Sequence, residues 1–295
     1  MKKRKWMIAP ALLLALAGCG GGGGGGSSDN QTIAASPEAP AVSALVTSSI
    51  QQLQADLAAV SGVSAEQAES ISAITSSQIS ADGVSSSSDL GDVLPSLLSG
   101  AIKGIGVTLT GDTLVNGAIS QSIATVMSIL GNESASSRTL QRSSALTISF
   151  QSLLEKIVET AVTSLNALQL DESALQESIG NVVSSVVANL GKAKVQASDV
   201  GTAIQSVTKS ATSGLAKLKV SDTTKITFKN QVKSTVETSI EDLAATEPEL
   251  VLAAEVEAIQ ASAAQGVEDA GLVDPATLDN ATFGTSKFGQ SKFGN

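Results

Sequence analysis

The main pattern in the chain is a helical spacing of apolar residues that begins at Ala41 and continues over most of the sequence. Apolar side chains recur at intervals of three and four, which places them on one face of a helix with 3.6 residues per turn. The stretches with this spacing are 45–60, 119–130, 153–168, 175–190, 232–243 and 256–267. Each stretch is predicted to form an amphipathic helix that turns its apolar face to the core.

Residues that begin and end helices support this prediction. Ser64 followed by Gln67, and Thr246 followed by Glu249, have the spacing of a capping box, in which two side chains bond the first turn of a helix. Asp274-Pro275 has the pattern of a further helix start. The glycines expected at helix ends are Gly62, Gly131, Gly191 and Gly271.

Two segments have instead the alternating pattern of a β-strand. Ile105, Val107 and Leu109 alternate with other residues, and so do Ile226 and Phe228. Because the chain is also rich in Ser, Thr and Val, a β-solenoid is an alternative fold. The long stretches with a period of 3.6, and the absence of a regular β repeat, favour helices.

Small side chains fill many positions beside the apolar stripes. Ala, Ser, Gly and Thr allow helix backbones to approach closely, so little bulk separates neighbouring helices. With Phe150 and Phe228 as its aromatic residues, the core is expected to be aliphatic and thin. The sequence therefore predicts an all-α, elongated bundle of six to nine helices over residues 41–280. Breaks within it, between two possible subdomains, are expected at 85–88 and 132–142.

Residues 1–19 have the pattern of an export signal. Four basic residues at positions 2–5 precede an apolar run over 7–17, which is shorter than the roughly 20 residues that a membrane-spanning helix needs. The run ends in Leu16-Ala17-Gly18-Cys19. This ending resembles the lipobox of bacterial lipoproteins, which consists of a leucine, two small residues and a cysteine. An ordinary signal peptide followed by a free thiol is the alternative.

The resemblance implies a lipid anchor. Lipoproteins of this kind receive a diacylglyceryl group on the cysteine, here Cys19, and lose the signal, here residues 1–18. Two or more acyl chains hold a protein stably on a membrane where one does not. Gly20 stands where an aspartate would favour retention in the inner membrane, so the resemblance points to the outer membrane. Residues 19–40, with an unbroken glycine run over 20–26, are expected to form a flexible tether.

Composition excludes several kinds of chemistry. The chain has no His and one Cys, which excludes Ser-His-Asp and Cys-His catalysis and zinc sites built on those residues. A net charge of −10 and an aromatic content of 2% make nucleic acid an unexpected partner. No cofactor or metal is expected.

The remaining candidate chemistry is weak. Ser206-Val207-Thr208-Lys209 matches the S-x-x-K motif of penicillin-binding proteins and β-lactamases, but the accompanying K-T-G strand is missing. The many acidic residues are expected to lie on solvated helix faces. Residues 113–132 carry no charge over a membrane-length window, yet their Ser, Thr, Asn and Gln favour a buried helix over a membrane span.

The C-terminal residues 281–295 hold a short repeat. Phenylalanine followed by glycine recurs every five residues, at Phe283, Phe288 and Phe293, beside Lys287 and Lys292. A floppy tail without a role is one interpretation. The other is a docking segment whose aromatic rings insert into a partner protein or a lipid surface.

These observations predict a non-catalytic envelope lipoprotein with a structural or binding role. The alternatives are a carrier of lipid or another apolar ligand, and an envelope hydrolase that uses carboxylates. The expected partners are the membrane, through the acyl chains on Cys19, and a neighbouring envelope protein.

Overall fold

The stretches with helical spacing form helices in the computed structural model of the protein, which describes residues 39–84, 90–139 and 149–272. Within these ranges the chain forms only helices, which confirms the predicted all-α multi-helix bundle and excludes a β-solenoid there. The nine α-helices are α1 (Ala39–Ala58), α2 (Ala65–Ala81), α3 (Leu90–Thr108), α4 (Asp112–Thr139), α5 (Phe150–Ser164), α6 (Glu172–Ala188), α7 (Val200–Ala216), α8 (Asp222–Thr246) and α9 (Val256–Asp269). Three short 3-10 helices lie between them: η1 (Leu165–Ala167), η2 (Ala197–Asp199) and η3 (Ala253–Glu255).

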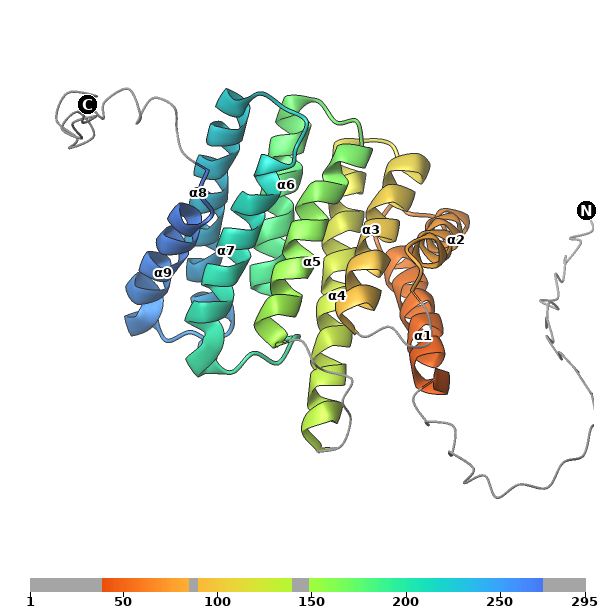
Figure 1. Ribbon diagram of the computed structural model, residues 1–295, viewed down its shortest axis with the longest axis horizontal. Helices are drawn as coiled ribbons and strands as arrows, with labels where there is room; N and C mark the ends of the chain where they lie inside the picture. The colour runs from red at the N-terminus through yellow and green to blue at the C-terminus, as the bar shows by residue number, and fades with distance from the viewer. Residues whose placement is uncertain (1–38, 85–89, 140–148, 273–295) are drawn as a thin grey trace, which may run out of the picture. The chain divides into compact units, whose positions relative to one another are not determined.

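The helices pack in two layers (Figure 1). One layer contains α2, α3, α5, α7 and α9, which contact one another in that order. The second contains α1, α4, α6 and α8 in the same way. From α3 onward the chain alternates between the layers, so it builds a row of helical hairpins whose buried side chains form one continuous core.

Three of these hairpins repeat one another. In α3–α4, α5–α6 and α7–α8, the second helix begins 22 positions after the first (90 to 112, 150 to 172 and 200 to 222). Seven equivalent positions of the first helix are buried in all three hairpins. They are Val93, Leu94, Leu97, Leu98, Ala101, Ile102 and Ile105 in α3; Leu153, Leu154, Ile157, Val158, Ala161 and Val162 in α5, with Leu165 in η1 directly after it; and Ala203, Ile204, Val207, Thr208, Ala211, Thr212 and Leu215 in α7. This repeat is not apparent in the sequence, because the burial pattern recurs while the residue types change.

The second helix of the last hairpin differs from its counterparts. α4 buries Val115, Ile119, Ile123 and Met127, and α6 buries Leu175, Ile179, Val183 and Val187. The equivalent residues of α8 are Lys225, Lys229, Lys233 and Glu237. This polar face is partly covered, because the Lys229 amine lies 3.5 Å from Glu268 of α9 and donates to the Leu272 carbonyl at 2.9 Å.

The two strand-like segments are helical, and that part of the prediction was wrong. Ile105 and Val107 lie in the last turns of α3, and Ile226 and Phe228 lie in α8. The alternation near Ile105 comes from Gly104 and Gly106. A Cβ on Gly104 would lie 3.0 Å from the carbonyl oxygen of Ile71 in α2, so helix packing explains that glycine.

Predicted helix ends are right in some places and wrong in others. The capping box at Ser64 and Gln67 is present, and Gly62, Gly191 and Gly271 follow helix ends. Thr246 is instead the last residue of α8, where the Glu247 N–H donates to the Leu243 carbonyl at 2.8 Å. Gly131 lies inside α4, where a Cβ would come within 3.0 Å of the Ala193 Cα.

Among the described residues, two helices are long and apolar enough to cross a membrane: α3, and the Asp112–Glu133 part of α4. In each, 67% of the apolar window is buried among the other helices. The burial of α4 agrees with the sequence prediction of a buried helix over 113–132. The described part of the predicted break at 132–142 is helical, because α4 continues through Asn132 to Thr139. The break predicted at 85–88 lies outside the described residues.

Candidate functional site

The site residues predicted from sequence lie outside the described residues. Cys19 belongs to the N-terminal 38 residues, and Phe283, Phe288 and Phe293 belong to the segment after Leu272. Asp274-Pro275 lies in the same segment. A candidate site within the bundle must therefore come from other residues.

The S-x-x-K match does not bring its two reactive groups together. Ser206 is buried, and its hydroxyl accepts a hydrogen bond from the Gln151 side-chain amide at 3.2 Å. Lys209 is exposed on α7, and no hydrogen bond between it and Ser206 is present in the described chain. A lysine base must lie within hydrogen-bond reach of the serine it activates, so this motif is interpreted as ordinary helix sequence.

Acidic residues lie mainly on helix surfaces and at helix starts. Glu159 on α5 accepts a hydrogen bond from the Lys217 amine, and Lys229 on α8 lies 3.5 Å from Glu268 on α9. A backbone N–H at the start of α2 and the Ser64 hydroxyl hold the pKa of the Glu66 carboxyl below its usual value. In the described ranges, no three His, Cys, Asp or Glu side chains come together as metal ligands could.

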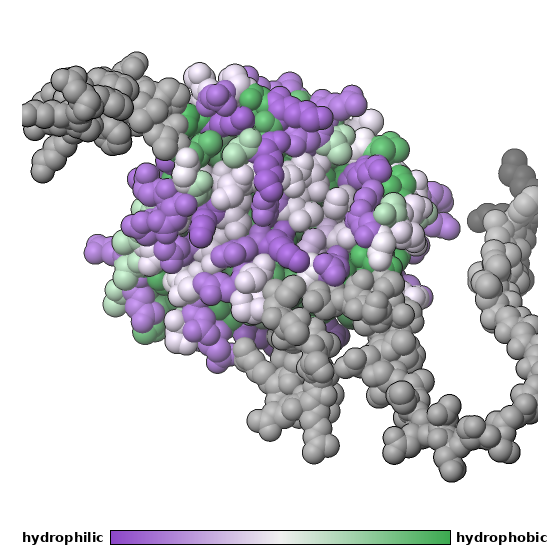
Figure 2. Space-filling model, viewed as in Figure 1, coloured by the Kyte–Doolittle hydropathy of each residue, from purple (hydrophilic) through white to green (hydrophobic). Residues whose placement is uncertain are grey.

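The body surface shows no broad apolar patch on the face drawn in Figure 2. Hydrophilic residues and residues of intermediate hydropathy cover most of that face, and hydrophobic residues stand in small separate groups. The most exposed large apolar side chains of the described chain are Val107 at 73% and Leu252 at 57%, far apart in the sequence. Isolated apolar residues of this kind are normal on a soluble surface.

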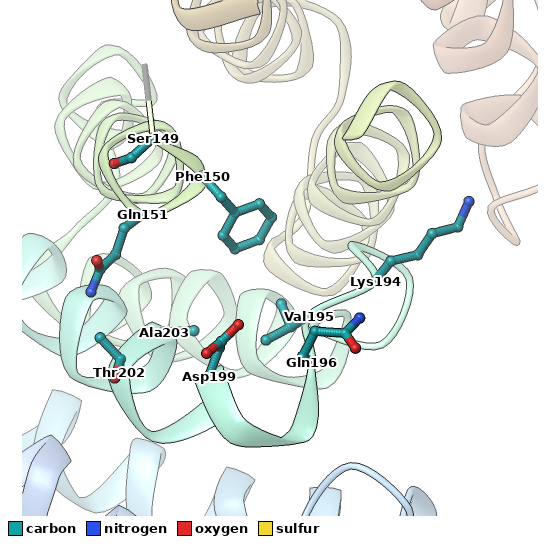
Figure 3. Close-up of a pocket in the computed structure, with 9 residues that line it drawn as sticks. All are labelled: Ser149, Phe150, Gln151, Lys194, Val195, Gln196, Asp199, Thr202 and Ala203. Atoms are coloured by element: carbon teal, nitrogen blue, oxygen red, sulfur yellow. The ribbon is translucent and has the colours of Figure 1, made fainter. Parts of the chain in front are cut away.

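A hollow of about 260 Å³ lies where the starts of α5 and α7 meet the segment that follows α6. We call it the Phe150 hollow, after the aromatic residue that enters it in Figure 3. Its lining consists of Ser149, Phe150, Gln151, Lys194, Val195, Gln196, Asp199, Thr202 and Ala203. These residues come from two neighbouring hairpins, so packing α5 against α7 creates the hollow.

Local turns position the lining residues. The Ser149 hydroxyl caps α5 by accepting the Ser152 N–H at 3.1 Å, which fixes where Phe150 begins the helix. After α6, Lys194 adopts a left-handed backbone with a φ of 56°. The chain then turns through η2, where the Asp199 N–H donates to the Gln196 carbonyl at 2.8 Å. This path brings both Gln196 and Asp199 beside Phe150.

The hollow combines an apolar wall with polar side chains. Phe150 and Val195 are half-buried and Ala203 is buried, whereas the polar lining residues are exposed to solvent. Asp199 precedes α7, yet its carboxylate caps no backbone N–H of that helix; it accepts a hydrogen bond from the Ser198 hydroxyl at 3.3 Å. Lys194 extends away from the other labelled side chains and donates to Asn132 at 3.4 Å. The arrangement can bind a small polar molecule with one apolar face.

A second, larger hollow lies over α6 between α4 and α8. Its volume is about 450 Å³, and its lining is mostly small or uncharged, including Gly117, Ser120, Ala124 and Ser184. Nothing in it resembles an aromatic wall beside polar groups. Of the hollows described, the Phe150 hollow therefore has the more specific chemistry.

Comparison with known proteins gives no further guide. No known protein family matches the chain, and no curated protein is significantly similar to it in sequence.

Proposed function

We propose that the protein is a lipid-anchored envelope lipoprotein whose helical body has a non-catalytic binding role. The observation that carries the proposal is Leu16-Ala17-Gly18-Cys19 at the end of a basic and apolar N-terminal segment. The chain has no other cysteine, so Cys19 cannot form a disulfide bond within the chain. Thioether-linked acyl chains would hold the protein on the membrane surface without a spanning helix.

The architecture of the body supports a binding role. Stacked helical hairpins contact mainly their neighbours, and they commonly present extended surfaces to partners. In this protein the stack carries the mixed lining of the Phe150 hollow. A lipid carrier would instead need an apolar space long enough for an acyl chain, whereas the Phe150 hollow has a volume of about 260 Å³ and six polar residues among the nine that line it. The carrier alternative predicts co-purified lipid, which mass spectrometry of extracts would detect.

The test of the anchor is metabolic labelling with a fatty acid. Wild-type protein should incorporate the label, and Cys19→Ser should not, because the thiol is the acceptor. Equal labelling of the two proteins would overturn the proposal.

The outer-membrane location is tested with Gly20→Asp. In a cell with two membranes, the wild type should fractionate with the outer membrane and the variant should shift to the inner membrane. The asparagine of Gly20→Asn has nearly the same shape as the aspartate of Gly20→Asp but no charge. This variant therefore separates the effect of the charge from that of the side-chain size.

The C-terminal repeat is proposed to dock to a neighbouring envelope protein. Three phenylalanines on a five-residue period, beside lysines, give an otherwise aromatic-poor chain large apolar contact area at its end. Replacing Phe283, Phe288 and Phe293 together by Ser should reduce crosslinking to that partner in intact cells. The melting temperature should stay within about 2 °C, because docking to a partner predicts that these side chains add little to the stability of the bundle. Unchanged crosslinking would contradict docking.

A further inference from the structure

We infer that the Phe150 hollow binds a neutral sugar ring of a glycan, an inference that rests on the proposed envelope location and specifies the binding role. Phe150 is half-buried and lines the hollow, where a ligand can reach its ring. The body has two aromatic residues between 39 and 272, Phe150 and Phe228. Phe228 is fully buried in the core, whereas Phe150 enters a hollow that is open to solvent. An aromatic ring there offers a flat apolar surface, on which the C–H face of a sugar ring can pack.

The polar side chains around that ring can form hydrogen bonds with the hydroxyl groups of a sugar. The Asp199 carboxylate can only accept hydrogen bonds, and the Gln196 amide can both donate and accept. The side chains of Gln196 and Thr202 make no hydrogen bond among the described residues. Each hydroxyl of a sugar is both a donor and an acceptor, so neighbouring hydroxyls can satisfy the carboxylate and an amide together.

The charges around the hollow favour a neutral ligand. Asp199 contributes a negative charge, whereas the amine of the basic lining residue, Lys194, extends away and bonds Asn132. The starts of α5 and α7 also border the hollow, and each helix start carries a partial positive charge of about half a unit. These partial charges offset the carboxylate, so neither an anion nor an organic cation meets an uncompensated opposite charge there.

The size of the hollow also favours a single sugar ring as its ligand. At about 260 Å³ it is smaller than the roughly 300–1,000 Å³ of pockets that enclose drug-sized ligands. It has room for one ring, with the rest of a chain continuing into solvent. An open hollow of this size suits weak recognition of an exposed glycan unit more than enclosure of a free metabolite.

The test measures binding to the full-length protein, purified in a detergent without a sugar headgroup. Ligand-observed NMR and calorimetry would be run with glucose, N-acetylglucosamine and chitotriose at up to about 10 mM, a range suited to millimolar affinity. Tetramethylammonium and inorganic phosphate serve as the charged probes. We expect at least one sugar to bind, with tighter binding of chitotriose than of its monomer if a glycan chain is the natural source.

Variants locate the binding. Phe150→Leu keeps an apolar side chain but removes the ring, and Asp199→Asn keeps the shape but removes the charge. Each should weaken sugar binding by about fivefold or more, whereas Lys192→Ala, at an exposed position outside the lining of the hollow, should bind like the wild type. Melting curves identify any variant that has lost its fold. If either Phe150→Leu or Asp199→Asn has done so, sugar binding by the other variant decides the test.

Three results would overturn the inference: no sugar in the panel binds, sugar binding survives both variants, or a charged probe binds more tightly than every sugar. Fatty-acid labelling of the same preparation separates this result from the proposed function. If the protein carries the label on Cys19 but binds no sugar, only the inference about the ligand is rejected. If the protein carries no label, the proposed lipid anchor is rejected.

Discussion

Gly100 of α3 lies directly against the backbone of Thr75 in α2, so that a Cβ on Gly100 would come within 2.8 Å of the Thr75 Cα. One turn later, Gly104 stands in the same relation to Ile71. The two glycines form a small-residue face on which α2 and α3 pack closely. The sequence prediction that small residues bring helix backbones together is confirmed at this contact.

Gly100→Ala should therefore destabilise the protein. Alanine gains up to about 1 kcal/mol over glycine in a helix, but overpacking against a backbone that cannot move aside costs about 1–3 kcal/mol. The net effect should be a loss of about 1 kcal/mol, or roughly 2–4 °C in melting temperature for a body of this size. Gly117→Ala in α4 is the matched control, because its Cβ would meet the Val60 side chain at an ordinary 3.6 Å. Thermal melts should show the control unchanged or stabilised; equal destabilisation of both variants would contradict the packing argument.

Ser64 at the start of α2 provides a test of a predicted cap. Its hydroxyl accepts the Gln67 N–H at 3.2 Å, and the Gln67 side chain accepts the Ser64 N–H at 2.8 Å. Ser64→Ala should cost about 0.5–2 kcal/mol, because a helix-start N–H loses its partner. Ser61→Ala, at an exposed turn residue three positions earlier, should be neutral in the same denaturant titration. A neutral Ser64→Ala would show that the cap adds nothing to stability.

Glu66 adds a pH dependence to the same helix start. The lowered pKa of its carboxyl means that the folded state favours the ionised form. The resulting stabilisation is present above the usual pKa of a glutamate and is lost as the pH falls through the lowered value in the folded protein. NMR titration of the Glu66 side chain should give a midpoint below the roughly 4.3 of an unperturbed glutamate. A midpoint at or above that value would contradict the effect.

The helices could be predicted because the spacing of apolar residues within each amphipathic helix shows which of its faces is buried. Side chains three and four positions apart share a face, and the apolar stripes predicted over 153–168 and 175–190 are buried except for the half-buried Leu168. Glycine is harder to interpret. A glycine that ends a helix and one that lets two helices touch look alike in a sequence, which is why Gly131 was taken for a helix end.

The Phe150 hollow could not be predicted in this way. Its lining comes from 149–151 and 194–203, and only the packing of α5 against α7 brings these segments together. Phe150 was expected in the core, and its half-exposed place follows from its position as the first residue of α5. The glutamines and hydroxyls around it are ordinary surface residues, and no short motif connects them.

Val183 on α6 provides the strongest test of the core. Its side chain has no exposed surface, and its equivalents in the neighbouring hairpins are Ile123 and Lys233. Val183→Asp should cost about 3–5 kcal/mol, a large part of the roughly 5–15 kcal/mol that holds a typical protein folded, because an unpaired carboxylate loses its hydration there. Ser184→Asp, at the adjacent half-exposed position, should cost less than about 1 kcal/mol.

The pH dependence of Val183→Asp separates the charge from the change of shape. Burial favours the neutral acid, so the pKa of the new carboxyl should rise above its unfolded value. The penalty is then complete above the raised pKa and shrinks as the pH falls toward the unfolded value, where the acid is protonated in both states. Relative to the wild type, Val183→Asp should therefore recover stability between pH 7 and about pH 4, while Val183→Asn, which cannot ionise, should not. Denaturant titrations at several pH values would show this, and parallel behaviour of the two variants would mean that position 183 is open to water.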